Sequence, residues 1–430
     1  MPLCGIHNHL VSIEIVLVKK KMNRFKFILI VLIYLAAHNF FNPLGVISPQ
    51  LGKAVFYGLS LVGLLYAMRT NPNKHMAYPK KSYRWILIGI IVSILSVWLV
   101  YDQPLTISVM ATLPYIFAYL YFFILMKFAP DKKQLFKFVE VMVACSLFMY
   151  LANLVTVPNV VFGAEEESYD YSRGVVRLAV PMIELIVLYL LYSVNQWVIT
   201  GKKKWFIGIG IMTFLVVMSV TRQVILLSLG FSFLLIMQRA KLWKKIVVLV
   251  VVWFSVSYIL PEIPIYKSLM EVSEAQAERN KYKEEDIRIT AWRFYTIEYQ
   301  ENWVTQIIGN GLPSIGNSKR GDQIEMETYP AYGGNGCFYV DVGWAGFYWL
   351  FGIFATVALG CLLVKASKKC FTDNRHYLFY WFLFILISSI ASAPIIFSQQ
   401  VVSLCICLYL VYGKDNEKGK IYSVNHPQLQ

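Results

Sequence analysis

The chain has 430 residues, of which 57% are apolar and only 15% charged, and its formal net charge is +15. A typical soluble domain is about 25% charged, so this composition excludes an ordinary soluble or disordered protein. The apolar residues fall into blocks of about 17–25, the length that an α-helix needs to cross the hydrocarbon core of a bilayer. Because a spanning segment must satisfy its own backbone polar groups, we predict an all-α integral membrane protein.

In chain order, twelve segments have the apolar character of a transmembrane helix. They are residues 25–41, 47–68, 85–101, 105–128, 138–157, 175–199, 205–220, 223–238, 246–260, 338–364, 376–393 and 394–412. Two pairs, 205–238 and 376–412, must each turn within a few residues, at Ser219–Gln223 and at Ser392–Pro394. If either pair were one long helix, the bundle would have ten or eleven transmembrane helices instead of about 12.

The distribution of basic residues predicts the orientation. With a cytoplasmic N-terminus, 28 of the 40 Lys and Arg residues fall in cytoplasmic loops and tails, and eight of the others lie in the long segment 261–337. By the positive-inside rule, both termini are expected in the cytoplasm. The net charge then reflects topology and contact with anionic lipid, so the bilayer is an expected partner and nucleic acid is not.

The expected organisation is one membrane bundle with a large external loop. The first apolar block is followed at once by another, so it is typical of a signal anchor, and Met22 is an alternative start to Met1. Of the seven cysteines only Cys337 is expected outside, which excludes an external disulfide framework. The predicted divisions are a cytoplasmic segment 1–24, helices 1–9 in 25–260, a partly helical extracytoplasmic loop 261–337, helices 10–12 in 338–412 and a cytoplasmic tail 413–430.

Charged residues near the outer surface are the candidates for function, because charges are costly there. If residues 173–184 are helical, Arg173, Arg177 and Glu184 share a face with Pro181. Such arginines either meet an anionic ligand or pair with nearby acids. Arg222 stands in a tight turn where Gly, Asn or Ser would suffice. A guanidinium suits a phosphate there, and a structural ion pair is the alternative.

Segment 267–301 has helical character, and it carries a stripe of Arg288, Trp292, Tyr295 and Tyr299 at helical spacing. Such a stripe is either packing or, together with Arg293, a site for sugar and phosphate.

Further along the chain, Gly309-Asn310-Gly311 and Gly333-Gly334-Asn335-Gly336 predict turns at which the backbone approaches another group closely. Neither cluster is followed by the lysine of a P-loop. Asp341, at the start of the tenth span, is either paired with an external arginine or functional.

Taken in order, these pieces resemble the O-antigen polymerase and O-antigen ligase superfamily. They are Thr221-Arg222, then Arg288 with Trp292, then Gly309-Asn310-Gly311, then Asn335-Gly336 leading into Asp341-Val342-Gly343-Trp344-Ala345-Gly346-Phe347. The resemblance implies a polytopic, inverting, metal-independent glycosyltransferase without a cofactor, acting in the bacterial cytoplasmic (inner) membrane. Its substrate would be an undecaprenyl-diphosphate-linked oligosaccharide, polymerised into O-antigen, capsule or exopolysaccharide, and a chain-length regulator is a candidate partner.

The ligases of that superfamily carry a histidine just before the Asn that opens the late helix. Here Tyr332-Gly333-Gly334 precedes Asn335, and segment 261–337 has no histidine. The sequence therefore favours a polymerase. A lipid-linked oligosaccharide flippase and a non-catalytic scaffold stay open as alternatives, although the halves show no internal repeat of the kind common in transporters.

The expected roles follow from the leaving group, a lipid diphosphate that gains negative charge as its bond to the sugar breaks. The predicted diphosphate clamp is formed by Arg222, Arg288 and Arg177, with Arg173 and Arg293 next. Of these, Arg222 and Arg288 are predicted to be catalytic, together with Glu184 and Asp341 as candidate bases. The predicted substrate-binding residues are Arg173, Arg177, Arg293, Trp292, Tyr295 and Asn335.

Overall fold

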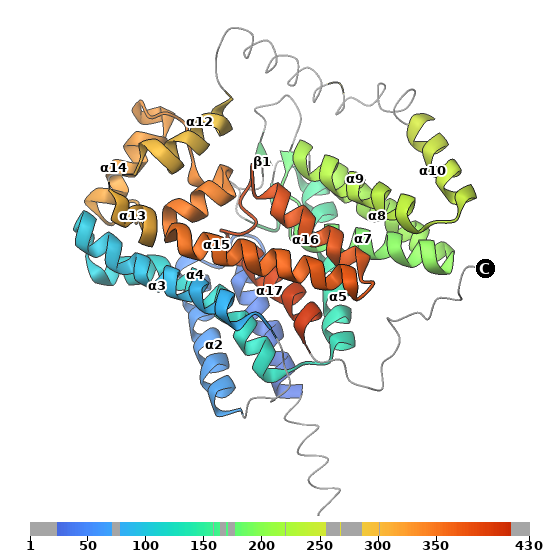
Figure 1. The fold of residues 1–430 in the computed structure, drawn as a ribbon, viewed down its shortest axis with the longest axis horizontal. Helices are drawn as coiled ribbons and strands as arrows, with labels where there is room; N and C mark the ends of the chain where they lie inside the picture. Colours follow the sequence, from blue (N-terminus) through green and yellow to red (C-terminus); the bar gives the residue numbers. More distant parts are fainter. Residues whose placement is uncertain are drawn as a thin grey trace, which may run out of the picture.

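The protein is helical almost throughout (Figure 1). The structure, a computed structural model, describes residues 24–70, 78–157, 159–163, 169–170, 177–219, 221–254, 267, 286–300 and 302–413. Within them the only paired strands longer than a single bridge are β1 (Tyr169–Asp170) and β2 (Arg177–Leu178), which run antiparallel. The all-α prediction is confirmed for this part of the chain.

Each of the twelve apolar segments contains a helix. These helices are residues 24–37, α2 (Pro49–Arg69), α3 (Lys80–Tyr101), α4 (Leu105–Phe128), α5 (Lys132–Thr156), α7 (Ile183–Thr200), α8 (Lys203–Met218), α9 (Arg222–Arg239), α10 (Leu242–Phe254), α15 (Gly343–Thr372), α16 (His376–Ser388) and α17 (Ser398–Tyr412). Both tight pairs are two helices and not one: α8 and α9 are separated near Thr221, and α16 and α17 by residues 389–397.

Seven of the described helices are long and apolar enough to cross a membrane, namely α2, α3, α4, α5, α7, α9 and α15. Large apolar side chains point outward from them, for example Leu99 of α3, Leu226 of α9 and Phe354 of α15. An outward apolar surface of this extent is costly in water and suits lipid. The protein is therefore an all-α membrane protein with at least these seven spanning candidates.

Several predicted boundaries differ from those of the helices, and two of the differences bear on the site. Residues 177–182, the first described part of this predicted span, are not helical: Arg177 lies in β2, and α7 begins only at Ile183. Pro181 disfavours helix in the residue before it, and Met182 adopts a left-handed conformation with φ 54°. Arg177 and Glu184 thus do not share a helix face. Similarly, the tenth span begins at Gly343 instead of 338, which leaves Asp341 outside the helix.

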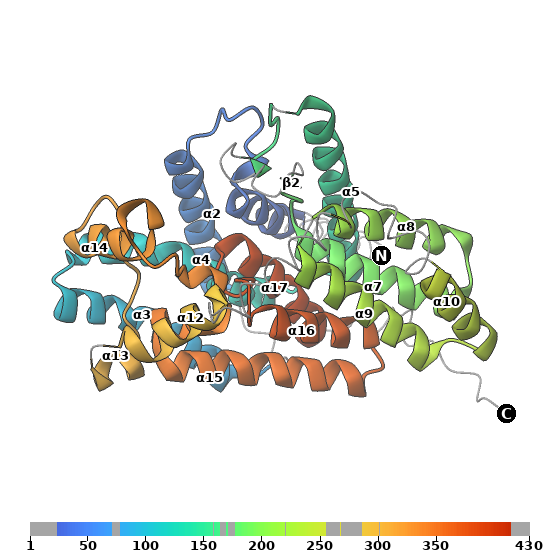
Figure 2. The same ribbon diagram turned by 90° about the horizontal axis from the view of Figure 1, so that it is seen from above.

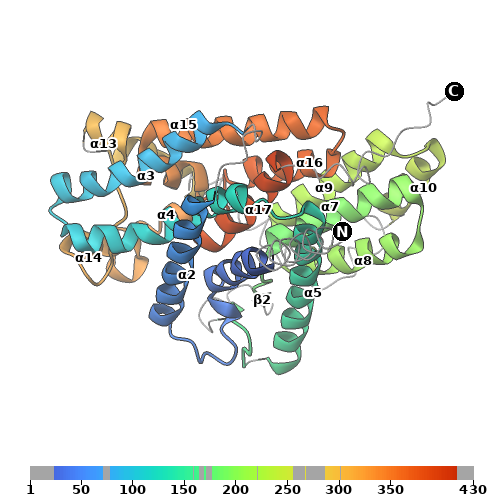
Figure 3. The same cartoon turned by 90° about the horizontal axis from the view of Figure 1, so that it is seen from below.

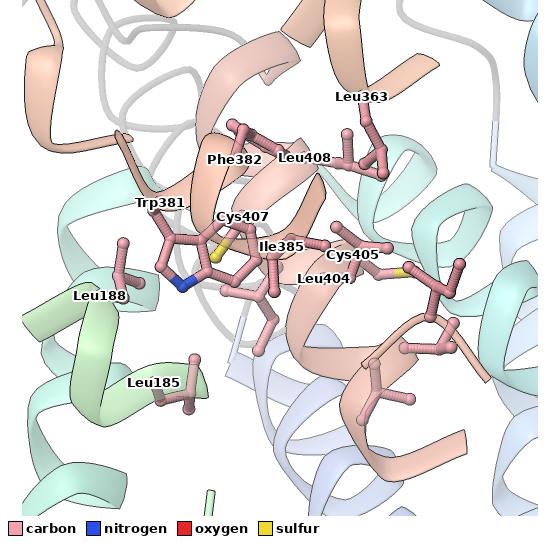
Figure 4. Close-up of a cluster of buried hydrophobic side chains, with 14 of the residues drawn as sticks. Leu185, Leu188, Leu363, Trp381, Phe382, Ile385, Leu404, Cys405, Cys407 and Leu408 are labelled. Carbon is pink, nitrogen blue, oxygen red and sulfur yellow. The ribbon is translucent and has the colours of Figure 1, made fainter. Parts of the chain in front are cut away.

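The centre of the bundle is α17, which is short but buried from Val401 to Tyr412. A helix that is apolar on all sides is stable only when other helices surround it. Figure 4 shows Leu404, Cys405 and Leu408 of α17 among side chains of α7, α15 and α16, including Trp381. These helices form the scaffold on which the site stands.

The basic ends of the helices contact one another. The Lys26 ammonium lies 5.8 Å from the ring centroids of both Tyr66 and Phe128, where α2 and α4 end. Lys127 donates to the Thr70 carbonyl, and at the end of α17 the Leu410 carbonyl accepts a bond from Arg375. These contacts join the helix ends next to the predicted cytoplasmic loops 69–84 and 127–137, and separately those next to loop 365–375 and the C-terminal tail.

Residues 286–341 form a cap over other helix ends, at the left of Figures 1, 2 and 3 beside α3 and α15. Its elements are α12 (Ile287–Arg293), a π-helical turn η4 (Phe294–Glu298), α13 (Trp303–Ile308), α14 (Lys319–Thr328) and two 3-10 turns, η5 (Pro330–Tyr332) and η6 (Tyr339–Asp341). The expectation of a partly helical loop is confirmed here. Its first part, 261–285, lies outside the described residues except for Lys267.

A kink in α15 holds the cap. Gly352 has φ 77° and ψ 175°, a conformation that breaks the helical hydrogen-bond ladder. The carbonyls of Trp349 and Leu350 accept bonds from the backbone N–H groups of Asn310 and Gly311, at 2.7 and 2.9 Å. A Cβ on Gly309 would overlap the Leu350 carbonyl. The Gly309-Asn310-Gly311 turn thus brings two backbones together, as predicted, and the group that it approaches is α15.

Candidate functional site

The site is built around the end of α16 and the start of the loop that follows, residues 386–392, which we call the α16 junction. Helix ends leave carbonyls without intrahelical partners, so they are free to bind other elements. The first residues of α15 use them: Gly343 N–H donates to Ser392 at 3.0 Å, and Trp344 N–H to Ser389 at 2.9 Å. The Trp344 indole donates to the Leu386 carbonyl at 2.9 Å.

Arg222 stands next to this junction. It is the first residue of α9 and is half-buried. The neighbouring Gln223 amide donates to the carbonyls of Ile387 and Ser388, at 3.2 and 3.0 Å. These bonds fix the start of α9 against the end of α16, where helical carbonyls favour a cation.

The element that carries Arg288, α12, binds the junction from the cap. The Asp286 carboxylate accepts the Arg288 backbone N–H at 2.8 Å and so begins α12 with Arg288 exposed. One turn later, the Trp292 indole donates to the Ile390 carbonyl at 2.7 Å. Gln223 and Trp292 therefore bind carbonyls only two to three residues apart, which brings the elements carrying Arg222 and Arg288 to one place.

Asp341 is the candidate acidic residue of this site. It ends η6, two residues before α15, and η6 packs against α12. Asp341 is exposed, but partial desolvation by the surrounding protein raises the pKa of its carboxyl, and the nearby Arg288 guanidinium opposes that shift. A carboxyl beside a cation, with a raised affinity for protons, has the properties required of a general base.

Glu184 lies deeper, in the first turn of α7, and is 5% exposed. Its backbone carbonyl accepts the Trp381 indole at 2.8 Å. Trp381 precedes Ile387 by six residues of α16, which is about 9 Å along a helix axis. The Glu184 carbonyl and the Gln223 amide therefore bind α16 at points more than one helical turn apart.

The other predicted arginines are not gathered there. The backbone of Arg177 pairs with Asp170 across the β1–β2 strands. Arg173 lies outside the described residues. Arg293 is exposed and forms a 2.7 Å ion pair with Glu298. Of the predicted cations, Arg222 and Arg288 lie on the two elements that bind the α16 junction through Gln223 and Trp292.

The predicted sugar-binding residues are largely structural where they are described. Tyr295 is 1% exposed, donates to the Cys337 carbonyl at 2.7 Å, and packs on Trp349. Trp292 is partly buried and donates to Ile390. The Asn335 side chain is exposed and accepts the Cys337 N–H at 2.8 Å within its own turn. The aromatic stripe thus follows the packing alternative, with Arg288 at its outer end.

Sequence analysis assigned no role to Arg320, which is 5% exposed within the cap. Arg320, Ile324 and Thr328 recur every four residues of α14, and all three are buried. That spacing was the signal available, since it places Arg320 on the apolar face. Gln103 was missed as well: it is 1% exposed and binds Leu312, Ser314 and Ser318 of the cap.

No family model matches the chain, and a comparison with curated proteins found no match. The geometry above therefore carries the functional argument. Among the described residues, no group of three or more His, Cys, Asp or Glu side chains converges on a point where a metal ion could bind.

Proposed function

We propose that the protein polymerises undecaprenyl-diphosphate-linked oligosaccharide repeats on the outer face of the bacterial cytoplasmic membrane. In this proposal twelve helices cross the bilayer, both termini are cytoplasmic and the cap is extracytoplasmic. The single observation that carries the proposal is the convergence of α9 and α12 on the α16 junction: Gln223, next to Arg222, and Trp292, one turn after Arg288, bind neighbouring carbonyls there, and Arg288 acts on the pKa of Asp341.

The proposed reaction is a displacement at the anomeric carbon. A sugar hydroxyl of one repeat attacks that carbon of another, while the bond to the diphosphate oxygen breaks and its electron pair leaves with the lipid diphosphate. The configuration inverts because attack comes from the face opposite the leaving group. The hydroxyl proton passes to the Asp341 carboxylate, and the proton later returns to solvent.

The two arginines act on the leaving group. Guanidinium groups fit phosphate oxygens with paired N–H donors, and charge that develops in a partly dehydrated site gains most from donors already in place. Arg222 is half-buried and Arg288 exposed, so the pair spans the edge between bundle and cap. A lipid-linked diphosphate carries its charge at this boundary, because its polyprenyl chain stays in the membrane. Arg177 and Glu184 remain secondary proposals for the clamp and the base.

The test is extension of a defined undecaprenyl-diphosphate-linked repeat by the purified protein in lipid nanodiscs. The expected product is a ladder of longer glycans on undecaprenyl diphosphate, with inverted linkage configuration. A ligase would instead need a separate acceptor lipid, and a flippase would move the substrate across a vesicle membrane without lengthening it. A lipid-linked repeat that is never extended, under conditions where the protein binds it, would contradict the proposal.

A further inference from the structure

Arg320 is a buried cation that the proposed chemistry does not use. It lies in α14, with its guanidinium carbon 3.4 Å from the ring centroid of Tyr101 at the end of α3. Its Nη1 donates to the Asn310 carbonyl at 2.6 Å. Burying a charge costs free energy even when it is paired. The burial of Arg320 is therefore more easily explained by a functional role than by stability alone.

The contacts of Arg320 join three parts of the molecule. Tyr101 belongs to the bundle, and Asn310 belongs to the turn that binds the kinked α15. The Tyr101 hydroxyl also donates to the Asn310 side chain. On the other side, the centroid of the Trp349 ring lies 5.9 Å from the guanidinium carbon. Arg320 thus stands where α3, the cap and α15 meet.

Trp349 connects this point to the proposed site. Its ring, which is fully buried, packs on Tyr295, Tyr299 and Tyr339 with centroids 5.1, 5.8 and 5.7 Å apart. Tyr295 follows Arg288 by two helical turns, and Tyr339 precedes Asp341 by two residues. The elements that carry Arg288 and Asp341 therefore both pack against the Trp349 indole ring.

A second charge faces the same cluster. Burial raises the pKa of the Tyr299 hydroxyl, and the Glu327 carboxylate raises it further, while Arg320 lowers it. Glu327 lies seven residues after Arg320 on α14, so both charges come from a single helix. A helix that presents a cation and an anion to one aromatic cluster has few orientations in which both are satisfied.

We propose that Arg320 is a positioning residue of the transferase: its stack on Tyr101 sets how the cap docks on α3 and α15, and Trp349 transmits that docking to Arg288 and Asp341. This inference rests on the proposed function for its catalytic part. The docking part is independent of it, because it concerns only how the cap sits on the bundle.

Three variants separate positioning from simple stability. Arg320→Met keeps the length of the side chain and removes both charge and donors. Arg320→Lys keeps the charge but loses the planar stack and the fixed fork of donors. The matched control is Lys319→Met, because Lys319 is the exposed neighbour on the same helix.

The first measurement reads docking without activity. Cys337 is 0% exposed, and burial raises the pKa of its thiol, so it should react slowly with a membrane-impermeant maleimide. In Arg320→Met we expect labelling of Cys337, assigned by mass spectrometry, to be about tenfold faster, because the cap opens more often. Lys319→Met should label at the wild-type rate. Unchanged labelling in Arg320→Met would overturn the docking part.

The second measurement reads positioning. In Arg320→Met, kcat for extension should fall about 100-fold with KM within about threefold of wild type, since small displacements of catalytic groups cost this much. The acid limb of the pH–rate profile should move to higher pH, because Arg288 no longer lowers the pKa of Asp341. In Arg320→Lys, kcat and the position of the acid limb should lie between those of wild type and Arg320→Met. If Arg320→Met is lost from the membrane, Arg320→Lys is the variant that tests positioning.

Faster labelling with unchanged kcat and acid limb would overturn the positioning role. An inactive wild-type protein would instead refute the proposed function and leave the labelling result standing.

Discussion

The indole nitrogen of Trp292 donates a hydrogen bond to the carbonyl of Ile390 at 2.7 Å, joining the cap to the loop that follows α16. Gln223 binds Ile387 and Ser388 from the other side. These bonds bring to one junction the two helices, α9 and α12, that carry Arg222 and Arg288, residues 66 positions apart in the chain. The bond of Trp292 is therefore the contact through which the cap can influence the proposed clamp.

Removing that bond should loosen the cap. Trp292→Phe keeps an aromatic ring but removes the donor to the Ile390 carbonyl, and because this hydrogen bond is exposed its loss should cost about 0.5–1.5 kcal/mol. We expect a lower apparent melting midpoint in detergent micelles together with slower extension. Trp303→Phe is the control, because Trp303 is 70% exposed and should change neither quantity. Equal effects of the two substitutions would argue against a role of the Trp292–Ile390 hydrogen bond in holding the cap.

The charge state of Asp341 should set the acid limb of activity. Partial desolvation raises the pKa of this carboxyl above its ordinary value of 3.8, and only the deprotonated form accepts a proton, so the rate should fall as pH drops through a pKa above 3.8. Arg288→Lys keeps a cation beside the carboxyl, and Arg288→Ala removes it. The limb of the residual activity should therefore lie at higher pH in Arg288→Ala than in Arg288→Lys.

Asp341→Asn separates catalysis from stability. Because the folded-state pKa is raised, the ionised carboxyl opposes folding at pH above its unfolded pKa, and the neutral amide does not. We expect Asp341→Asn to abolish extension at neutral pH without lowering the melting midpoint there. Loss of both activity and stability would indicate a structural role for Asp341.

The kink at Gly352 should be required for cap docking. Its backbone conformation is essentially restricted to glycine, and a Cβ there would overlap the Ile307 carbonyl, so Gly352→Ala should cost at least about 1–3 kcal/mol from strain alone. Gly360→Ala, in the same helix, adds a Cβ with no atom within 4 Å and should be neutral or stabilising. Thermal unfolding of both variants in the same detergent measures the difference.

Helix positions followed from hydrophobic blocks, because a spanning segment has little choice of secondary structure. The errors occurred at helix starts, where local chemistry decides. Pro181 and Met182 delay α7, and the bonds of Gly343 and Trp344 to the α16 junction set the start of α15. The periodicity of apolar residues carries no information about such long-range contacts. It therefore placed Arg177 and Asp341 inside helices that begin after them.

The site was predicted in part for a similar reason. The free-energy cost of placing a charged residue near the membrane identified Arg222, Arg288 and Asp341 as unusual. The structure brings together the elements that carry them. Arg320 was not identified, because a basic residue in the polar segment 261–337 is not unusual. Its burial becomes evident only in the structure, where it lies on the buried face of α14. Tyr295 was predicted to bind substrate but is buried in the structure, because helical spacing alone does not distinguish a ring that packs in the interior from a ring that binds a ligand.

The central claim is that Arg222 and Arg288 hold one diphosphate. The most direct measurement is binding and extension of an undecaprenyl-diphosphate-linked repeat by wild type, Arg222→Ala, Arg288→Ala and the double variant, with equal amounts of each protein in nanodiscs. We predict that each single variant loses about 100-fold or more in extension rate. The double variant should lose less than the product of the two, because both side chains serve the same group. Full-length polymer from either single variant would contradict the account.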